Sequence, residues 1–200
     1  YPLRRQRQMC IRDRMKPTPE QIKKINHFSQ VKLENCQKIA DVVDLQSCEP
    51  GTHLFKEGDR GDTMILVFQG QVEVSKEMMV KTSSGFATSR KSIIRLETTD
   101  PKPESKPETE STVFVVEAPA FGIGEFSLVL DNAIRTAHVH STTSLKYGVL
   151  KLEDFTKIVK ENPGIGGNVY FEVAKAAVNN LATVSGDVSN LTQAFFYALS

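Results

Sequence analysis

The spacing of apolar residues divides the chain into a helical start, a β-rich centre and a helical end. Between residues 18 and 43, apolar side chains return every three or four residues, which is the period of an amphipathic helix. Thr18-Pro19-Glu20 is a typical helix start, because a hydroxyl residue caps the first turn and proline fits the first helical position. The pattern predicts two helical pieces over residues 18–43. Their apolar positions are Ile22, Ile25, Phe28, Val31, Leu33, Ile39, Ala40 and Val43.

Short apolar runs separated by turn-forming residues follow from residue 45 to residue 150. Clusters such as Glu57-Gly58-Asp59 and Gln69-Gly70-Gln71 recur at the spacing typical of antiparallel strands. Strands are expected at 52–55, 64–68, 72–75, 91–97, 113–116, 137–141 and 145–150. We predict an α+β fold in which an antiparallel β jelly-roll (double-stranded β-helix) of about eight strands is flanked by N-terminal and C-terminal helices.

A polar segment interrupts the strands at residues 98–112. It contains three prolines and no aliphatic or aromatic residue, so it has too little apolar surface to order itself. We expect a disordered insertion in a hairpin loop, because the entropic cost of closing a loop grows only slowly with its length.

Helical spacing returns at residue 152 and predicts helices over residues 152–183. Leu152, Phe155, Ile158 and Val159 form one apolar face, and a second stripe begins at Val169. We expect 185–187 (Ser-Gly-Asp) to end the second helix, which leaves residues 186–200 as a short C-terminal helix or tail. The main domain is therefore predicted to span residues 15–185.

The basic N-terminus resembles a translated sequencing adapter. Residues 4–14 read RRQRQMCIRDR, so residues 1–14 are expected to be non-native and the natural chain to start at Met15. The other interpretation is a basic arm that binds nucleic acid. Removing the five arginines and one aspartate of this segment from 25 basic and 24 acidic residues leaves a net charge of −3. A mildly acidic body lacks the positive surface that supplies most affinity for DNA, so no DNA binding is expected.

Cysteine content and hydropathy predict a cytoplasmic protein with no membrane partner. Cys36 and Cys48 stand alone, outside any CxxC pair, which is typical of a reducing compartment. No run of about eighteen apolar residues is present, and nothing near Met15 resembles a secretory signal.

One segment, Gly124-Glu-Phe-Ser-Leu-Val-Leu-Asp-Asn-Ala-Ile-Arg-Thr-Ala137, combines residues suited to an anionic ligand. An arginine beside small residues lets a guanidinium and backbone N–H groups converge on one anion. Together with the glycine-punctuated strands of residues 49–74, this segment resembles the cyclic nucleotide-binding domain family, which includes catabolite activators and regulatory subunits of protein kinase A. The resemblance extends from about residue 27 to about residue 181. It implies a non-catalytic sensor that repositions its C-terminal helices when it binds cAMP or cGMP.

The resemblance also assigns roles to residues of the segment. Glu125 would accept a hydrogen bond from the ribose 2′-hydroxyl, and Arg135 would pair with the cyclic phosphate. Tyr170 or Val173 would contact the base. The ligand-binding residues implied are Gly124, Glu125, Phe126, Ser127, Arg135, Thr136 and Ala137. The segment departs from the family pattern in having Ile before Gly-Glu and Ile134 before the arginine, and Thr136 does not discriminate cAMP from cGMP.

Other interpretations stay open at this point. The chain could be a degenerate β-roll that binds no nucleotide and acts as an interaction or dimerisation module through its C-terminal aromatic residues, or it could bind an effector protein there. His138 and His140 share one strand face, as in metal-binding jelly rolls, but the expected carboxylate is missing, so we expect exposed histidines, no metal and no cofactor. No nucleophile with a matching base is apparent, so no enzymatic activity is expected.

Overall fold

Three short helices open the domain in the computed structural model, which describes residues 15–83, 85–103 and 113–199. The helices are α1 (Pro19–Lys23), the 3-10 helix η1 (Asn26–Phe28) and α2 (Leu33–Val42). Thr18 caps α1 and exchanges hydrogen bonds with Gln21, as expected for a capping box. The predicted helical start at residues 18–43 is confirmed, with residues 1–14 lying outside the described residues.

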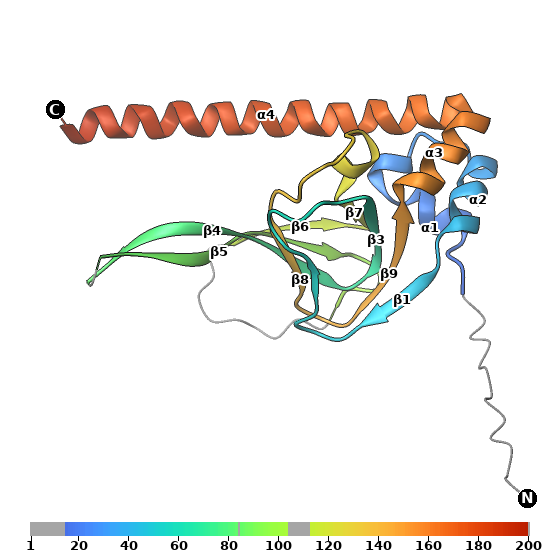
Figure 1. Ribbon diagram of the computed structural model, residues 1–200, viewed down its shortest axis with the longest axis horizontal. Coiled ribbons are helices and arrows are strands. Elements are labelled where there is room, and N and C mark those ends of the chain that lie inside the picture. Colours follow the sequence, from blue (N-terminus) through green and yellow to red (C-terminus); the bar gives the residue numbers. More distant parts are fainter. Residues whose placement is uncertain (1–14, 84, 104–112, 200) are drawn as a thin grey trace, which may run out of the picture.

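Nine strands in the described residues form two facing sheets, which confirms the β-roll (Figure 1). One sheet has the order β1-β9-β3-β7 and the other β2-β8-β4-β5-β6. The strands are β1 (Leu45–Cys48), β2 (His53–Phe55), β3 (Thr63–Gln69), β4 (Gln71–Thr82), β5 (Gly85–Thr98), β6 (Phe114–Ala118), β7 (Phe121–Ile123), β8 (His138–Ser141) and β9 (Leu145–Lys151). Of these, β1 and β7 were not predicted from the sequence.

The connection between β5 and β6 differs from the expectation. These strands pair in parallel, from Ile94 opposite Phe114 to Thr98 opposite Ala118. The polar segment therefore joins two parallel neighbours and does not close a hairpin, because parallel strands need a crossover connection. Most of that predicted insertion, residues 104–112, lies outside the described residues.

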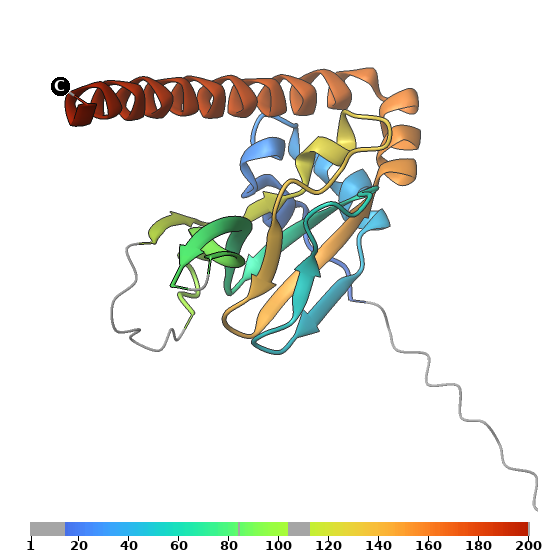
Figure 2. The same cartoon turned by 60° about the vertical axis from the view of Figure 1, so that its left-hand side comes forward.

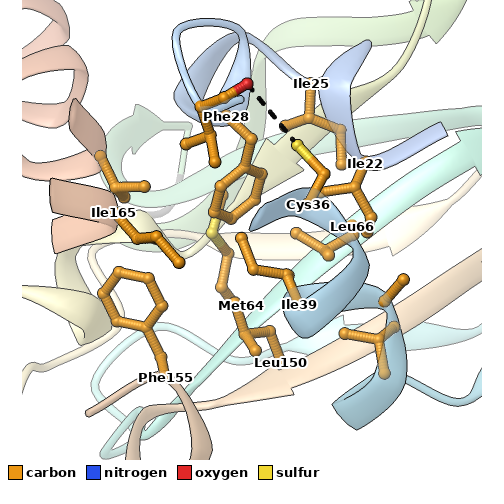
Figure 3. Close-up of a cluster of buried hydrophobic side chains, with 14 of the residues drawn as sticks. Ile22, Ile25, Phe28, Cys36, Ile39, Met64, Leu66, Leu150, Phe155 and Ile165 are labelled. Atoms are coloured by element: carbon orange, nitrogen blue, oxygen red, sulfur yellow. Dashed lines mark hydrogen bonds between the residues drawn. The ribbon is translucent and has the colours of Figure 1, made fainter. Parts of the chain in front are cut away.

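Strand β3 has a buried core on each of its faces. Met64 and Leu66 point to the layer of helices, whereas Ile65 and Val67 point between the two sheets. Figure 3 shows the first cluster, in which Phe28 and Met64 pack beside Phe155 of the C-terminal helices. Burial on both faces explains why β3 reads as an unbroken apolar run.

The C-terminal helices are α3 (Leu152–Glu161) and α4 (Pro163–Leu199). Helix α4 is one continuous element of 37 residues, so the predicted end at residues 185–187 and the separate short helix at 186–200 are wrong. A single glycine costs a helix only about 1 kcal/mol relative to alanine and leaves its hydrogen bonds in place. Figure 1 and Figure 2 show α4 crossing the top of the β-roll and extending well past it.

Candidate functional site

The segment between β7 and β8 forms a compact loop around a short 3-10 helix, η2 (Glu125–Leu128). Gly124 precedes this helix with φ of 81°, a left-handed conformation that favours glycine. A Cβ at Gly124 would also overlap Nη1 of Arg135. Gly124 thus meets two requirements, a backbone turn and close approach to the guanidinium.

Arg135 is the most constrained charged side chain of the loop. Its side chain is buried, with only 8 % of the residue exposed. Nη2 donates hydrogen bonds to the carbonyl oxygen of Thr63 at 2.8 Å and to Oγ1 of Thr63 at 2.9 Å. The guanidinium carbon lies 3.6 Å from the ring centroid of Phe55, a cation–π geometry. These contacts fix the guanidinium in one orientation.

The guanidinium is held mainly by neutral groups. Burial lowers the pKa of Arg135, and the negative charges of Asp62 and Glu125 act in the opposite direction. An arginine nevertheless stays protonated at neutral pH. A buried positive charge whose hydrogen bonds go to a carbonyl and a hydroxyl retains the capacity to bind an anion.

Gly61 is a part of the site that sequence reasoning missed. In the sequence, Gly61 is one of the glycines that punctuate the strands of residues 49–74. A Cβ at Gly61 would overlap the guanidinium carbon and Nε of Arg135, and the Gly61 N–H donates to the carbonyl of Ala133 at 2.8 Å. Gly61 therefore makes room for the arginine and ties the connection between β2 and β3 to the loop.

A cavity of about 320 Å³ lies over the loop. It brings together all seven residues implied by the resemblance: Gly124, Glu125, Phe126, Ser127, Arg135, Thr136 and Ala137. Apolar side chains of the sheets, such as Val74, Leu96 and Val139, complete its wall. A cavity with one guanidinium, one carboxylate and an apolar wall suits a ligand that carries an anion, hydroxyl groups and a flat apolar part.

The hydrogen-bond donors of the loop differ in whether they already have an acceptor. The Ser127 hydroxyl lies 2.7 Å from the carbonyl of Gly124 and 2.8 Å from that of Thr63, so it braces the loop. The Ser127 N–H also donates to Gly124. The N–H groups of Glu125 and Phe126 form no hydrogen bond within the described residues, as is usual for the first turn of a helix without a side-chain cap.

The two residues predicted to contact the base, Tyr170 and Val173, are not among the residues that line the cavity. Val173 is buried in the helical core, and Tyr170 stacks edge-on against Phe155 with ring centroids 5.9 Å apart. The residue of α4 that lines the cavity is Asn180. Because α4 continues without a break and rises about 1.5 Å per residue, it carries Asn180 some 15 Å beyond Tyr170 and over the cavity.

The two strand histidines are less exposed than expected. His138 is only 2 % exposed, and its Nδ1 accepts a hydrogen bond from the Glu57 N–H. Its Nε2 lies 3.3 Å from Oε1 of Glu77 without hydrogen-bond geometry. The expectation of exposed histidines is wrong because the long β4 strand brings Glu77 over this face. Within residues 15–83, 85–103 and 113–199, no group of three His, Cys, Asp or Glu side chains is arranged to hold a metal ion.

The fold is similar to that of cyclic nucleotide-binding proteins of known structure. A search against models of protein families finds no match. Among solved structures, the catabolite activator protein of Thermus thermophilus superposes with a TM-score of 0.59 at 17 % identity, over 84 % of this chain and 63 % of that one. A cyclic nucleotide-binding domain from Methylobacillus flagellatus gives 0.58 at 20 % identity, over 82 % and 79 %. The N-terminal domain of a Streptomyces coelicolor transcriptional regulator gives 0.58 at 19 % identity, over 82 % and 94 %.

Proposed function

We propose that this chain is a regulatory domain that binds a cyclic nucleoside monophosphate, cAMP or cGMP, in the cavity over residues 124–137. The observation that carries the proposal is the buried guanidinium of Arg135 in the same cavity as the carboxylate of Glu125. One arginine matches the single negative charge of a cyclic phosphate, so no metal is required. The domain performs no catalytic step and acts in the cytoplasm, where Cys36 and Cys48 stay as free thiols.

Each part of the ligand has a matching group. The cyclic phosphate pairs with the guanidinium of Arg135 and accepts hydrogen bonds from the free N–H groups at the start of η2. Glu125 accepts a hydrogen bond from the ribose 2′-hydroxyl. The base lies against the apolar wall, with Asn180 beside it. An amide both donates and accepts, so Asn180 accommodates adenine as well as guanine.

Calorimetric titration of the chain with cAMP and with cGMP tests this function. Binding of either nucleotide is expected, and Arg135→Glu should abolish it by replacing attraction with repulsion. Arg60→Glu is the matched control, because Arg60 is exposed and lies outside the cavity. Absence of binding at millimolar nucleotide, or equal binding by the Arg135→Glu variant, would refute the proposal.

We also propose that two copies of the chain pair through α4. Apolar residues recur along this helix at alternating intervals of three and four: Ala174, Ala177, Leu181, Val184, Val188, Leu191 and Phe195. This is the heptad spacing of a coiled coil. The last five of these side chains are 56–70 % exposed in the single chain, so a partner helix would remove a continuous apolar stripe from water. Residues 185–187 (Ser-Gly-Asp) fall between Val184 and Val188, off this stripe.

The pairing offers a route from ligand to helix. Asn180 lines the cavity and its neighbour Leu181 lies on the heptad stripe. We consider two arrangements of the helix pair that differ in the position of Asn180. A ligand that binds one of them more tightly shifts the equilibrium toward it by the difference between its two binding free energies. The alternative, a β-roll that only dimerises, keeps the pairing and lacks the ligand.

Sedimentation of the full chain tests the pairing. Leu181→Asp combined with Leu191→Asp should convert dimers to monomers, because it places charges in the apolar stripe. Thr183→Asp adds a charge to the same helix off the stripe and should leave the dimer intact. The interaction-module alternative gains support if the chain dimerises and neither the chain nor the Arg135→Glu variant binds nucleotide. A monomeric chain would rule out both forms of pairing.

A further inference from the structure

The β4–β5 hairpin extends beyond the sheet to which it belongs. Strand β8 accompanies β4 only as far as Ser75, and β6 accompanies β5 only from Ile94. From Lys76 opposite Lys91 to Thr82 opposite Gly85, the two strands form a ribbon about 20 Å long that no third described strand flanks. Figure 1 shows this ribbon projecting from the side of the roll. An isolated two-stranded ribbon is only marginally stable in water, so a further contact is expected to stabilise it. The chemistry of its exposed side chains indicates the kind of contact.

Both faces of the ribbon carry exposed apolar side chains. Met79 and Phe86 lie diagonally on one face and are 76 % and 74 % exposed. Met78 and Val80 lie on the opposite face, and Met78 is 44 % exposed. Docking on one protein surface would cover only one of these faces. A medium that surrounds the ribbon would contact both.

The apolar side chains are accompanied by a positive charge. Residues 76–91 contain four basic residues, Lys76, Lys81, Arg90 and Lys91, and one acidic residue, Glu77. Lys76, Arg90 and Lys91 lie on the body side of Met78 and Met79, so they form a collar behind the apolar part. The nearest carboxylates are 3.9 Å away, from Glu57 to Lys76 and from Glu77 to Arg90, which leaves these cations weakly paired.

We propose that this ribbon inserts its apolar side chains into the headgroup region of a bilayer that contains anionic lipids, while the basic collar contacts the lipid phosphates and carboxylates. Apolar side chains flanked by Lys and Arg are the arrangement that binds the membrane interface, and each basic residue near an anionic surface adds to the attraction. The unpaired outer edges of the two strands confine insertion to this polar region, because an open sheet edge is not tolerated in hydrocarbon. The expectation of no membrane partner was based on spanning segments, and no helix of the described residues is long and apolar enough to cross a bilayer.

Co-sedimentation of the full chain with vesicles tests the proposal. Phosphatidylcholine vesicles with phosphatidylserine should pellet the protein at low salt, and pure phosphatidylcholine vesicles should not. Met79→Ser with Phe86→Ser should lower the partition coefficient more than about tenfold. Lys76→Gln with Lys91→Gln should lower it by a similar factor, and high salt should do the same to the unmodified chain.

Two controls separate this inference from other causes. Phe114→Ser with Val115→Ser removes comparable exposed apolar side chains from β6 and should leave vesicle binding unchanged. Equal binding to both kinds of vesicle, no binding, or binding unaffected by Met79→Ser with Phe86→Ser would each overturn the proposal. A change in the sedimentation of the free protein caused by Met79→Ser with Phe86→Ser would also overturn the proposal. The apolar side chains of the ribbon would then contact a second copy of the chain. The outcome does not depend on nucleotide binding.

Discussion

Gly61→Ala is a direct test of how the cavity positions its positive charge. The added Cβ would overlap the guanidinium carbon and Nε of Arg135, which are the far end of a flexible side chain. The side chain can therefore move away, and the fold should survive. The guanidinium would then leave the place defined by Phe55 and Thr63. A hydrogen bond to a charged group contributes about 1.5–3 kcal/mol, so nucleotide affinity should fall about 10- to 150-fold.

Calorimetry with cAMP and cGMP measures this loss, and urea unfolding checks that the domain is intact. Gly164→Ala is the matched control, because a Cβ at Gly164 meets no atom within 4 Å. Its affinity should equal that of the unmodified chain. If Gly61→Ala also binds nucleotide with unchanged affinity, the orientation of Arg135 does not determine binding, and the reasoning from the cavity fails.

Substitutions at three further positions probe the site and its surroundings. Thr63→Val removes the hydroxyl that accepts from Arg135 and should weaken nucleotide binding about 5- to 10-fold in the same titration, whereas Thr63→Ser should not. Ser127→Ala removes a buried hydrogen bond and should lower the free energy of unfolding by about 1 kcal/mol in urea. Burial lowers the pKa of His27 from its ordinary value of 6.5, so the folded chain binds a proton less readily than the unfolded one, and stability should fall as the pH drops below about 6.5. His27→Gln should flatten that slope in urea unfolding between about pH 5 and 7, and an unchanged slope would contradict it.

Local patterns in the sequence were sufficient for most of the fold. Capping residues and the helical period locate the first helices, and turn residues separate the strands of the roll. The parallel pairing of β5 with β6 was not accessible, because the period of a strand does not reveal which neighbour it takes. The length of β4 and β5 was missed because the ribbon beyond Ser75 faces solvent and lacks the apolar alternation of a strand packed on a core.

The sequence predicted the part of the candidate site that lies in one continuous segment, residues 124–137. Glu125 and Arg135 lie in that segment, and the cavity contains both. Gly61 and Asn180 come from distant parts of the chain, and each acts through a contact that only folding creates. Gly61 has the appearance of an ordinary turn residue until Arg135 is placed against it. Asn180 could not be assigned to the site while residues 185–187 were expected to end the helix. The unbroken length of α4 places Asn180 at the cavity and its neighbour Leu181 on the exposed apolar stripe.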